Sequence, residues 1–165
     1  MKKFRLSPIT KEDIEFIYFL RSISKDNVLK KSNRIENSKF LNQIMSQGNC
    51  GYFKYECDTE IVGYYRFYSV NGNMEIGSWI TNPSSSPTEK ILFDLEFKKQ
   101  VFNLTGQEYI YFDVRKHNFS VWKHHERFGA EFIKEDVLNR YYKLNKEIYN
   151  HKYHEKIDRI NKRTV

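Results

Sequence analysis

Three consecutive stretches rich in aromatic and β-branched residues lie in the middle of the chain and restrict what it can fold into. These stretches, residues 51–57, 60–70 and 73–81, are separated by Asp58-Thr59 and by Asn71-Gly72. Asn-Gly between two such stretches is typical of a hairpin turn, because both central positions of that turn need positive φ angles. The sequence therefore predicts an antiparallel meander of three strands.

A helix and a further strand are expected after the meander. Ser86 is typical of an N-cap, Pro87 of the first helical position, and Glu89 completes a capping box. The helix is expected to end at Gly106, and residues 109–114 are expected to form a strand. Strand, helix and strand in this order form a βαβ crossover, so the two strands are expected to be parallel.

The remaining elements are shorter. They are a strand at 2–8, a helix over about 11–21 capped by Thr10 and Asp13, a helix at 38–47 ended by Gly48, a helix capped by Asn118 and ending before Gly129, strands that begin at Phe132 and Tyr141, and a charged C-terminal stretch. This order predicts an α/β fold with a mixed sheet that is antiparallel first and parallel at its centre.

Composition narrows the class of protein. The chain has 165 residues, enough for one domain, with 28 Lys and Arg against 21 Asp and Glu and a formal charge of +7. The basic residues are spread along the chain, so this charge alone does not identify an anionic partner. Two cysteines, Cys50 and Cys57, exclude a disulfide framework. No apolar stretch approaches the ~18 residues of a membrane span, and the basic start lacks the apolar region of a secretory signal, so we expect a cytoplasmic protein.

The segment Ser84–Lys90 is the first candidate for binding chemistry. The N-terminus of a helix presents unpaired N–H groups and partial positive charge, which suit a phosphate. Lys90 adds a cation, although the segment is not a P-loop. The alternative is an ordinary capped helix that binds nothing.

A histidine-rich helix is the second candidate. His125 shares one face with Trp122 and Phe128, where a group that titrates near neutral pH can act in proton transfer. The alternative is a hydrogen-bonded histidine of the core. His117 and His124 lie close in sequence, but the spacing is not that of a zinc helix, so we expect no metal.

Glu75 is the third candidate. Alternation along its strand predicts Glu75, Gly77 and Trp79 on one face and Ile76 and Ile80 on the other. A partly desolvated carboxylate on a central strand has a raised pKa and can act as a base. The alternative is a solvent-facing glutamate.

The element order and two segments together resemble the GCN5-related N-acetyltransferases (GNAT) over residues 2–146. The segments are Glu75-Ile-Gly-Ser-Trp-Ile and the stretch from Asp113 to Ala130, which includes Asn118 and Gly129. The resemblance implies a sheet of about seven strands, mostly antiparallel, with a parallel pair splayed at its centre. It also implies an acetyltransferase domain over 1–146, followed by a charged helix or tail over 147–165.

The resemblance further implies transfer of an acetyl group from acetyl-coenzyme A to a primary amine. The second segment looks most like members that acetylate nucleotide-linked amino sugars in surface-polysaccharide biosynthesis. By this resemblance Glu75 is the general base and His125, where the family often has Tyr, is the general acid. The implied coenzyme contacts are Trp79, Ile80, Thr81, Ser86, Thr88, Glu89, Lys90, Asn118 and Ser120. The family's glycines in the pyrophosphate loop are replaced here, by Pro87, Glu89 and Ile91 in this alignment.

Two other functions stay open. The segment Glu75-Ile-Gly-Ser-Trp-Ile also resembles acetyltransferases that act on the N-termini of ribosomal proteins. Basic charge with 16% aromatic residues would suit a nonenzymatic module that binds single-stranded nucleic acid, although no signature of such a module is present. We therefore expect a small amine as partner, with neither nucleic acid nor a membrane, and we allow for a homodimer.

Overall fold

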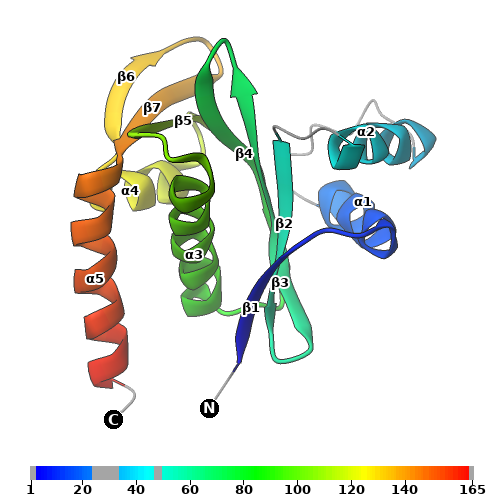
Figure 1. The fold of residues 1–165 in the computed structure, drawn as a ribbon, viewed down its shortest axis with the longest axis horizontal. Helices are drawn as coiled ribbons and strands as arrows, with labels where there is room; N and C mark the ends of the chain where they lie inside the picture. The colour runs from blue at the N-terminus through cyan, green and yellow to red at the C-terminus, as the bar shows by residue number, and fades with distance from the viewer. Residues whose placement is uncertain (1–2, 24–33, 47–49, 164–165) are drawn as a thin grey trace. The chain divides into compact units, whose positions relative to one another are not determined.

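The computed structural model describes residues 3–23, 34–46 and 50–163 (Figure 1). Within them the chain forms two compact units, one of residues up to Tyr68 with 77–98, and one of 69–76 with the residues from Lys99 onward. None of the helices in these ranges is long and apolar enough to cross a membrane. The expected helix end at Gly48 lies outside the described residues.

A seven-stranded sheet organises the fold. The elements are β1 (Phe4–Pro8), the 3₁₀ turn η1 (Lys11–Asp13), α1 (Ile14–Ile23), α2 (Arg34–Ser46), β2 (Cys50–Cys57), β3 (Glu60–Val70), β4 (Asn73–Thr81), α3 (Pro87–Thr105), β5 (Tyr109–Arg115), α4 (Phe119–Arg127), β6 (Glu131–Glu135), β7 (Asn139–Asn145) and α5 (Lys146–Arg163). The strand order is β1-β2-β3-β4-β5-β7-β6. The predicted mixed sheet is confirmed: β4 and β5 are parallel, with Glu75 opposite Tyr111, and the other pairs described are antiparallel.

The turns of the meander have the backbone geometry that their residues favour. Asp58 has φ 57°, Asn71 has φ 50° and Gly72 has φ 82°. Glycine and, less freely, asparagine and aspartate adopt this left-handed region, so the sequence signal for both hairpins is confirmed.

The first unit packs helices on both faces of β2 and β3 (Figure 1). On one face, a core cluster contains buried residues of α1, α2, β2 and β3: Ile14, Ile17, Leu20, Leu41, Tyr52 and Tyr64. On the other face, Tyr65 stacks on Phe97 of α3 with ring centroids 4.1 Å apart, and Phe53 meets the same ring edge-on. The alternation of strand residues thus supplies both cores.

The start of α1 confirms the predicted capping box. The backbone N–H of Thr10 donates to Asp13 Oδ2 over 2.7 Å, and the contact of the Asp13 N–H with the Thr10 side chain completes the box. The Asp13 N–H also donates to the Thr10 carbonyl over 3.1 Å. Asp13 is also the partner of Lys54 and of the Tyr64 hydroxyl, each at 3.2 Å. Burial and this carboxylate raise the pKa of Tyr64 above its usual range. One aspartate therefore ties the first helix to β2 and β3.

The second unit is built on β5, β7 and β6. β7 lies between the other two strands, with Phe112 opposite Tyr142 and their rings stacked 5.6 Å apart. The helix α5 contributes the buried Tyr149, whose ring lies 5.5 Å from that of Phe102 at the end of α3. The charged C-terminal stretch is thus helical over the described residues, with one side of the helix buried.

Candidate active site

The strand β4 contains an irregularity at Ser78, where the non-glycine φ is +53°. A side chain placed on Gly77 would meet the Tyr68 ring, and that ring lies 4.2 Å from the Arg66 guanidinium on the α2 face of the sheet. Trp79 stacks instead on Tyr65, on the α3 face. Gly77 and Trp79 therefore point to opposite faces, as expected when a bulge inserts one extra residue.

The predicted alternation of β4 is wrong beyond this point. Ile80 packs against the cluster of α1 and α2, on the face to which Gly77 points, so Ile76 and Ile80 do not share a face. Positive φ at a serine is uncommon, and no local signal in the sequence predicts it. The bulge interrupts the regular ladder directly before the segment expected to contact the thioester.

The end of β4 is held against β3. The Asn82 N–H donates to the Val62 carbonyl over 2.8 Å, and its side-chain amide donates to the Ile61 carbonyl over 3.1 Å. The predicted coenzyme residues Trp79, Ile80 and Thr81 are half-buried and precede this anchor. Gly63 permits the close approach, because a side chain there would collide with the Ile80 carbonyl oxygen.

The predicted capping box at the start of α3 is confirmed. The Ser86 N–H donates to Glu89 Oε2 over 2.8 Å, and the Glu89 N–H donates to Ser86 Oγ over 3.2 Å. The Lys90 N–H donates to the Ser86 carbonyl, and Pro87 has no N–H. In this first turn, the backbone N–H of Thr88 therefore makes no hydrogen bond with any residue that the structure describes. The side chains of Ser86 and Thr88 are exposed, and those of Glu89 and Lys90 are half-buried.

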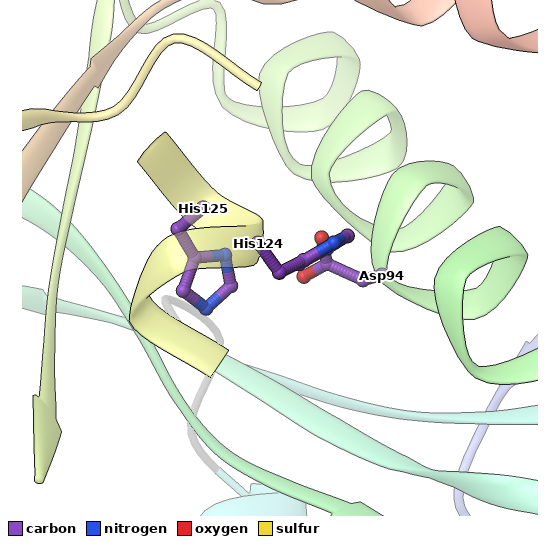
Figure 2. Close-up of side chains that lie close together, drawn as sticks. All are labelled: Asp94, His124 and His125. Carbon is purple, nitrogen blue, oxygen red and sulfur yellow. The ribbon is translucent and has the colours of Figure 1, made fainter. Parts of the chain in front are cut away.

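The middle of α3 holds a buried ion pair that the sequence analysis did not single out. Lys98 Nζ lies 2.7 Å from Asp94 Oδ2, and both side chains are 0% exposed (Figure 2 draws Asp94). Burial lowers the pKa of the lysine, and the aspartate partly offsets this. The available signal was an acid and a base four residues apart on the same helix.

His125 lies in α4, whose two histidine rings are drawn in Figure 2. It is 2% exposed, as expected for the inward face, and its ring meets Phe112 edge-on at 4.6 Å. The neighbouring His124 is half-buried, with its ring 5.3 Å from that of His125 and 5.0 Å from that of Phe128. Gly129, with φ 89°, ends the helix as predicted.

Asn118 occupies the N-cap position of α4, but the predicted side-chain cap is wrong. Its side chain makes no capping hydrogen bond; its backbone carbonyl accepts instead from the N–H groups of Val121 and Trp122. The backbone at Asn118 has ψ 61°, outside the extended range in which an N-cap side chain reaches back to the first turn. Ser120, in the first turn, is exposed.

Glu75 is half-buried on β4, in register with Tyr111 of β5. Residues in register on neighbouring strands point to the same face, whereas Tyr111 and Phe112 point to opposite faces. Because His125 packs against Phe112, Glu75 and His125 lie on opposite faces of this part of the sheet. Asp113, two residues beyond Tyr111, is a second carboxyl of the Glu75 face, and burial raises its pKa while Arg115 partly offsets this.

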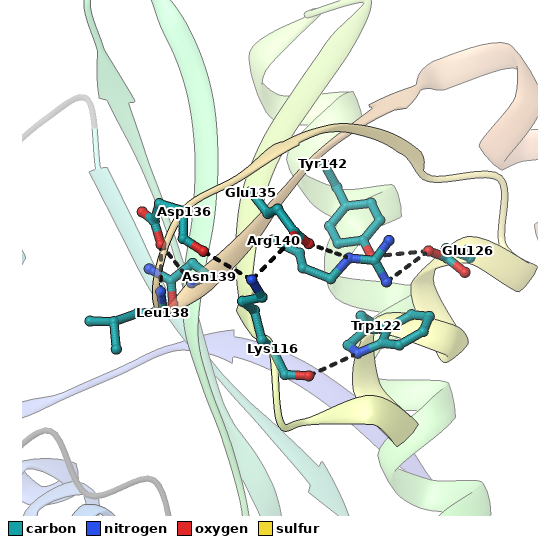
Figure 3. A network of polar contacts seen from close by, with 9 residues as sticks. All are labelled: Lys116, Trp122, Glu126, Glu135, Asp136, Leu138, Asn139, Arg140 and Tyr142. Carbon is teal, nitrogen blue, oxygen red and sulfur yellow. Dashed lines mark hydrogen bonds and ion pairs between the residues drawn. The ribbon is translucent and has the colours of Figure 1, made fainter.

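A polar network connects α4 with the loop that precedes it and with β6 and β7 (Figure 3). Arg140 of β7 lies between Glu126 and Glu135 and over the Trp122 ring at 4.2 Å. The indole N–H of Trp122 donates to the Lys116 carbonyl over 3.3 Å. The network therefore joins both ends of α4 to β6 and β7, and pairings so distant in sequence leave no local signal.

Comparison with known proteins adds to this geometry. No protein-family model and no curated protein sequence matches the chain. Among solved structures, FdhC, described as a nucleotide-linked sugar GNAT, matches over 93% of both chains with a TM-score of 0.82 and 24% identity. The chain has the GNAT fold. The expected fold, taken from the resemblance of the sequence, is thus confirmed.

Two further structures with this fold are similar. Spermidine N-acetyltransferase from Vibrio cholerae, in complex with CoA and spermine, has a TM-score of 0.77 and 14% identity, covering 89% of this chain and 98% of that one. The N-acetyltransferase PseH of Campylobacter jejuni, in complex with acetyl coenzyme A, has a TM-score of 0.68 and 20% identity, covering 87% and 99%. The GNAT folds similar to this chain thus include proteins with different amine substrates.

Proposed function

We propose that this chain is an acetyl-coenzyme A-dependent N-acetyltransferase whose acceptor is the primary amine of a nucleotide-linked amino sugar in surface-polysaccharide biosynthesis. The observation that carries the proposal is the match over 93% of both chains with a nucleotide-linked sugar GNAT. The match to PseH, solved with acetyl coenzyme A, supports the same cosubstrate. A cytoplasmic location and a homodimer remain part of the proposal, and the assigned residues need no metal.

The reaction needs few groups. The amine nitrogen attacks the carbonyl carbon of the thioester, the C–S bond breaks, and the acetyl group stays on nitrogen. Glu75, directly or through a water, takes the proton that the amine loses. His125 gives a proton to the leaving thiolate from the opposite face of the sheet, so the amine and the thiolate would have to approach β4 and β5 from different faces. A backbone N–H among Trp79–Thr81 stabilises the oxyanion, since a preformed donor costs no reorganisation as charge develops. The bulge at Ser78 supports this role because it interrupts the ladder just before these residues.

The first turn of α3 is the proposed site of the coenzyme's pyrophosphate. Its dipole and the neighbouring Lys90 favour negative charge there. The capping box, however, already uses the N–H groups of Ser86 and Glu89 and holds a carboxylate at the same turn. We therefore propose that pyrophosphate binding moves the Glu89 side chain out of the capping box, with Thr88 and Lys90 as the first contacts. Asn118 and Ser120, on the second unit, remain proposed contacts of the coenzyme.

Net charge does not identify the acceptor, but it bears on which candidates the chain attracts. A formal charge of +7 attracts a nucleotide diphosphate and repels a polycation such as spermidine. This favours the nucleotide-linked sugar over a polyamine, although both kinds of enzyme share the fold. A protein N-terminus remains the alternative acceptor, and binding of single-stranded nucleic acid the alternative outside catalysis.

The decisive experiment is an acceptor panel. Purified protein and acetyl-coenzyme A are incubated separately with nucleotide-linked amino sugars, the free amino sugars, spermidine and a peptide with a free N-terminus. Release of coenzyme A thiol is measured and each product is identified by mass spectrometry. We expect a mass gain of one acetyl group on a nucleotide-linked sugar, with kcat/KM at least ~10-fold above that for its free sugar. Preference for spermidine or the peptide would reassign the acceptor, and no transfer to any amine would overturn the proposal.

A further inference from the structure

Two arginines on the α1 and α2 face of the first unit have no carboxylate partner among the described residues. Arg21 lies in the last turn of α1, and Arg66 lies on β3 directly opposite Tyr52 of β2. Arg21 Nη1, Arg66 Nε and the Tyr52 hydroxyl are all buried atoms without a hydrogen bond in the structure. Buried polar atoms are nearly always paired, so three unpaired ones at adjoining positions indicate a missing ligand.

The three groups lie close enough to influence one another. Both guanidinium groups act electrostatically on the Tyr52 hydroxyl, although its burial is the larger effect and raises its pKa to about 12. Arg66 is held in place by rings, with its guanidinium carbon 4.2 Å from the Tyr68 centroid and 5.4 Å from that of Phe40 on α2. Stacking fixes the plane of the guanidinium but leaves its N–H groups available to an anion.

A buried acid of this face, Asp13, has other partners than the two arginines. The carboxylate of Asp13 is engaged by Lys54, by the Tyr64 hydroxyl and by the start of the first helix. Tyr52 also lines a cavity of about 250 Å³ together with Cys50 and Met45, but neither arginine is among its lining residues. The face therefore offers two forked cations and a neutral hydroxyl donor, which suit a phosphate group.

The pair lies on the opposite face of β2 and β3 from α3, whose first turn is the proposed site of the coenzyme's pyrophosphate. The end of β4 is anchored to Val62 through Asn82, and α3 begins five residues later at Pro87. Arg66 instead neighbours the bulge of β4, because the ring that it stacks on also meets Gly77.

We propose that Arg21, Arg66 and the Tyr52 hydroxyl bind the diphosphate of the nucleotide-linked acceptor. This assignment rests on the proposed function for the identity of the ligand. The pair of guanidinium groups takes the charge, and the hydroxyl donates to a phosphate oxygen.

Binding of uridine diphosphate and of inorganic pyrophosphate tests the proposal without any need for catalysis. Titration calorimetry compares wild type with Arg66→Gln, Arg21→Gln and Tyr52→Phe, and with Arg5→Gln as the matched control. Arg5 is an arginine of the same unit that is paired with Glu56 at 2.7 Å. We expect the dissociation constant to rise at least ~10-fold in each arginine variant and ~3-fold or more in Tyr52→Phe, with Arg5→Gln within 2-fold of wild type.

Tyr52→Phe separates a binding role from a structural one. Removal of an unpaired buried hydroxyl leaves the melting temperature unchanged or higher, yet weakens diphosphate binding. Unchanged affinity in Arg66→Gln and Tyr52→Phe would overturn the proposal. Displacement of uridine diphosphate by acetyl-coenzyme A, or an equal loss of acetyl-coenzyme A affinity in the variants, would also overturn it, because the site would then belong to the coenzyme. Diphosphate binding through these residues in a protein that acetylates no amine would support the anion site and refute only the proposed function.

Discussion

Glu89 is the residue at which the fold and the proposed chemistry compete most directly. Its carboxylate accepts from the N–H and the hydroxyl of Ser86 and so stabilises the start of α3. The same carboxylate places a negative charge where the coenzyme's pyrophosphate is expected. Coenzyme affinity therefore depends on the balance between the energy of the capping box and the repulsion that is relieved when it opens.

Substitution Glu89→Gln is expected to tighten acetyl-coenzyme A binding by ~2–5-fold, because a charge at a helix terminus contributes about 0.3–1 kcal/mol. The amide retains an oxygen that can accept the Ser86 hydrogen bonds, so the melting temperature should fall only slightly. Titration calorimetry on Glu89→Gln measures the effect, and Ser86→Glu, which adds a charge, should weaken binding. Weaker binding in Glu89→Gln would show that the carboxylate orders the turn for the coenzyme rather than opposing it.

Proton transfer by Glu75 and His125 is testable by a pair of substitutions. Glu75→Gln should lower turnover ~10²–10⁴-fold, the usual range for a lost general base. His125→Phe should have a smaller effect, because a thiolate with a pKa near that of free Cys leaves tolerably without help.

Steady-state rates from pH 6 to 9, with acetyl-coenzyme A affinity as the control, distinguish these roles from a folding defect. If both variants keep more than about a tenth of wild-type turnover, positioning and water would account for the reaction. Asp113, on the same face as Glu75, would then be the next carboxyl to test.

The contacts or burial of single residues could be predicted from sequence where a hydrogen bond between residues close in the chain, or helix periodicity, determines them. Ser86 with Glu89 and Thr10 with Asp13 are capping boxes spanning three residues, and His125 is buried as its helix face required. The predicted side-chain cap at Asn118 was wrong because the backbone there, with ψ 61°, is outside the extended range of an N-cap, which residue type alone does not reveal.

At the scale of elements, β4 shows that the presence of a strand can be predicted from sequence while the faces to which its side chains point cannot. Its existence and limits follow from its residues and from the Asn71-Gly72 turn, both confirmed. Its two halves present opposite alternation because Ser78 adds one residue with positive φ. The sites contributed by distant strands, such as Arg66 beside Tyr52, could not be predicted before the register of β2 and β3 was known.

Ser78 therefore gives a direct test of the bulge. Glycine adopts positive φ without the steric cost that other residues incur, so Ser78→Gly should raise unfolding stability, by up to ~1 kcal/mol. Ser78→Val should lower it, because a β-branched residue at positive φ is strongly disfavoured. Chemical denaturation of both variants measures the difference. A valine variant as stable as wild type would indicate that β4 continues without the bulge.

The turn between β6 and β7 depends on one ionised carboxylate (Figure 3). Asp136 accepts from the Tyr141 hydroxyl at 2.6 Å and from the N–H groups of Leu138 and Asn139. The tyrosine bond and then the two backbone bonds lower the pKa of Asp136 from 3.8 to about 2. The stabilising contribution is therefore complete above about pH 4 and is lost as the pH falls through about 2.

The expected consequence is a pH-dependent difference between wild type and Asp136→Asn. Wild type should melt at the higher temperature at pH 7, and the difference should shrink between pH 4 and pH 2 as the carboxylate is protonated. Melting curves at intervals from pH 7 to 2 measure it. A difference that stays constant over this range would mean that geometry, not charge, accounts for the role of Asp136.

At the scale of the whole molecule, the excess of 28 basic over 21 acidic residues creates a field that acts on every charged substrate. Salt screens such fields over about 10 Å at 0.1 M ionic strength, so long-range attraction weakens as salt is added. If the acceptor carries a diphosphate, kcat/KM at saturating acetyl-coenzyme A should fall ~3–10-fold between 20 and 300 mM salt. The same protein assayed with spermidine should show no fall, because screening relieves repulsion of a polycation. The opposite result, in which added salt lowers turnover of spermidine but not of the nucleotide-linked sugar, would mean that a local acidic site attracts the acceptor. It would argue for a polyamine acceptor in spite of the net charge.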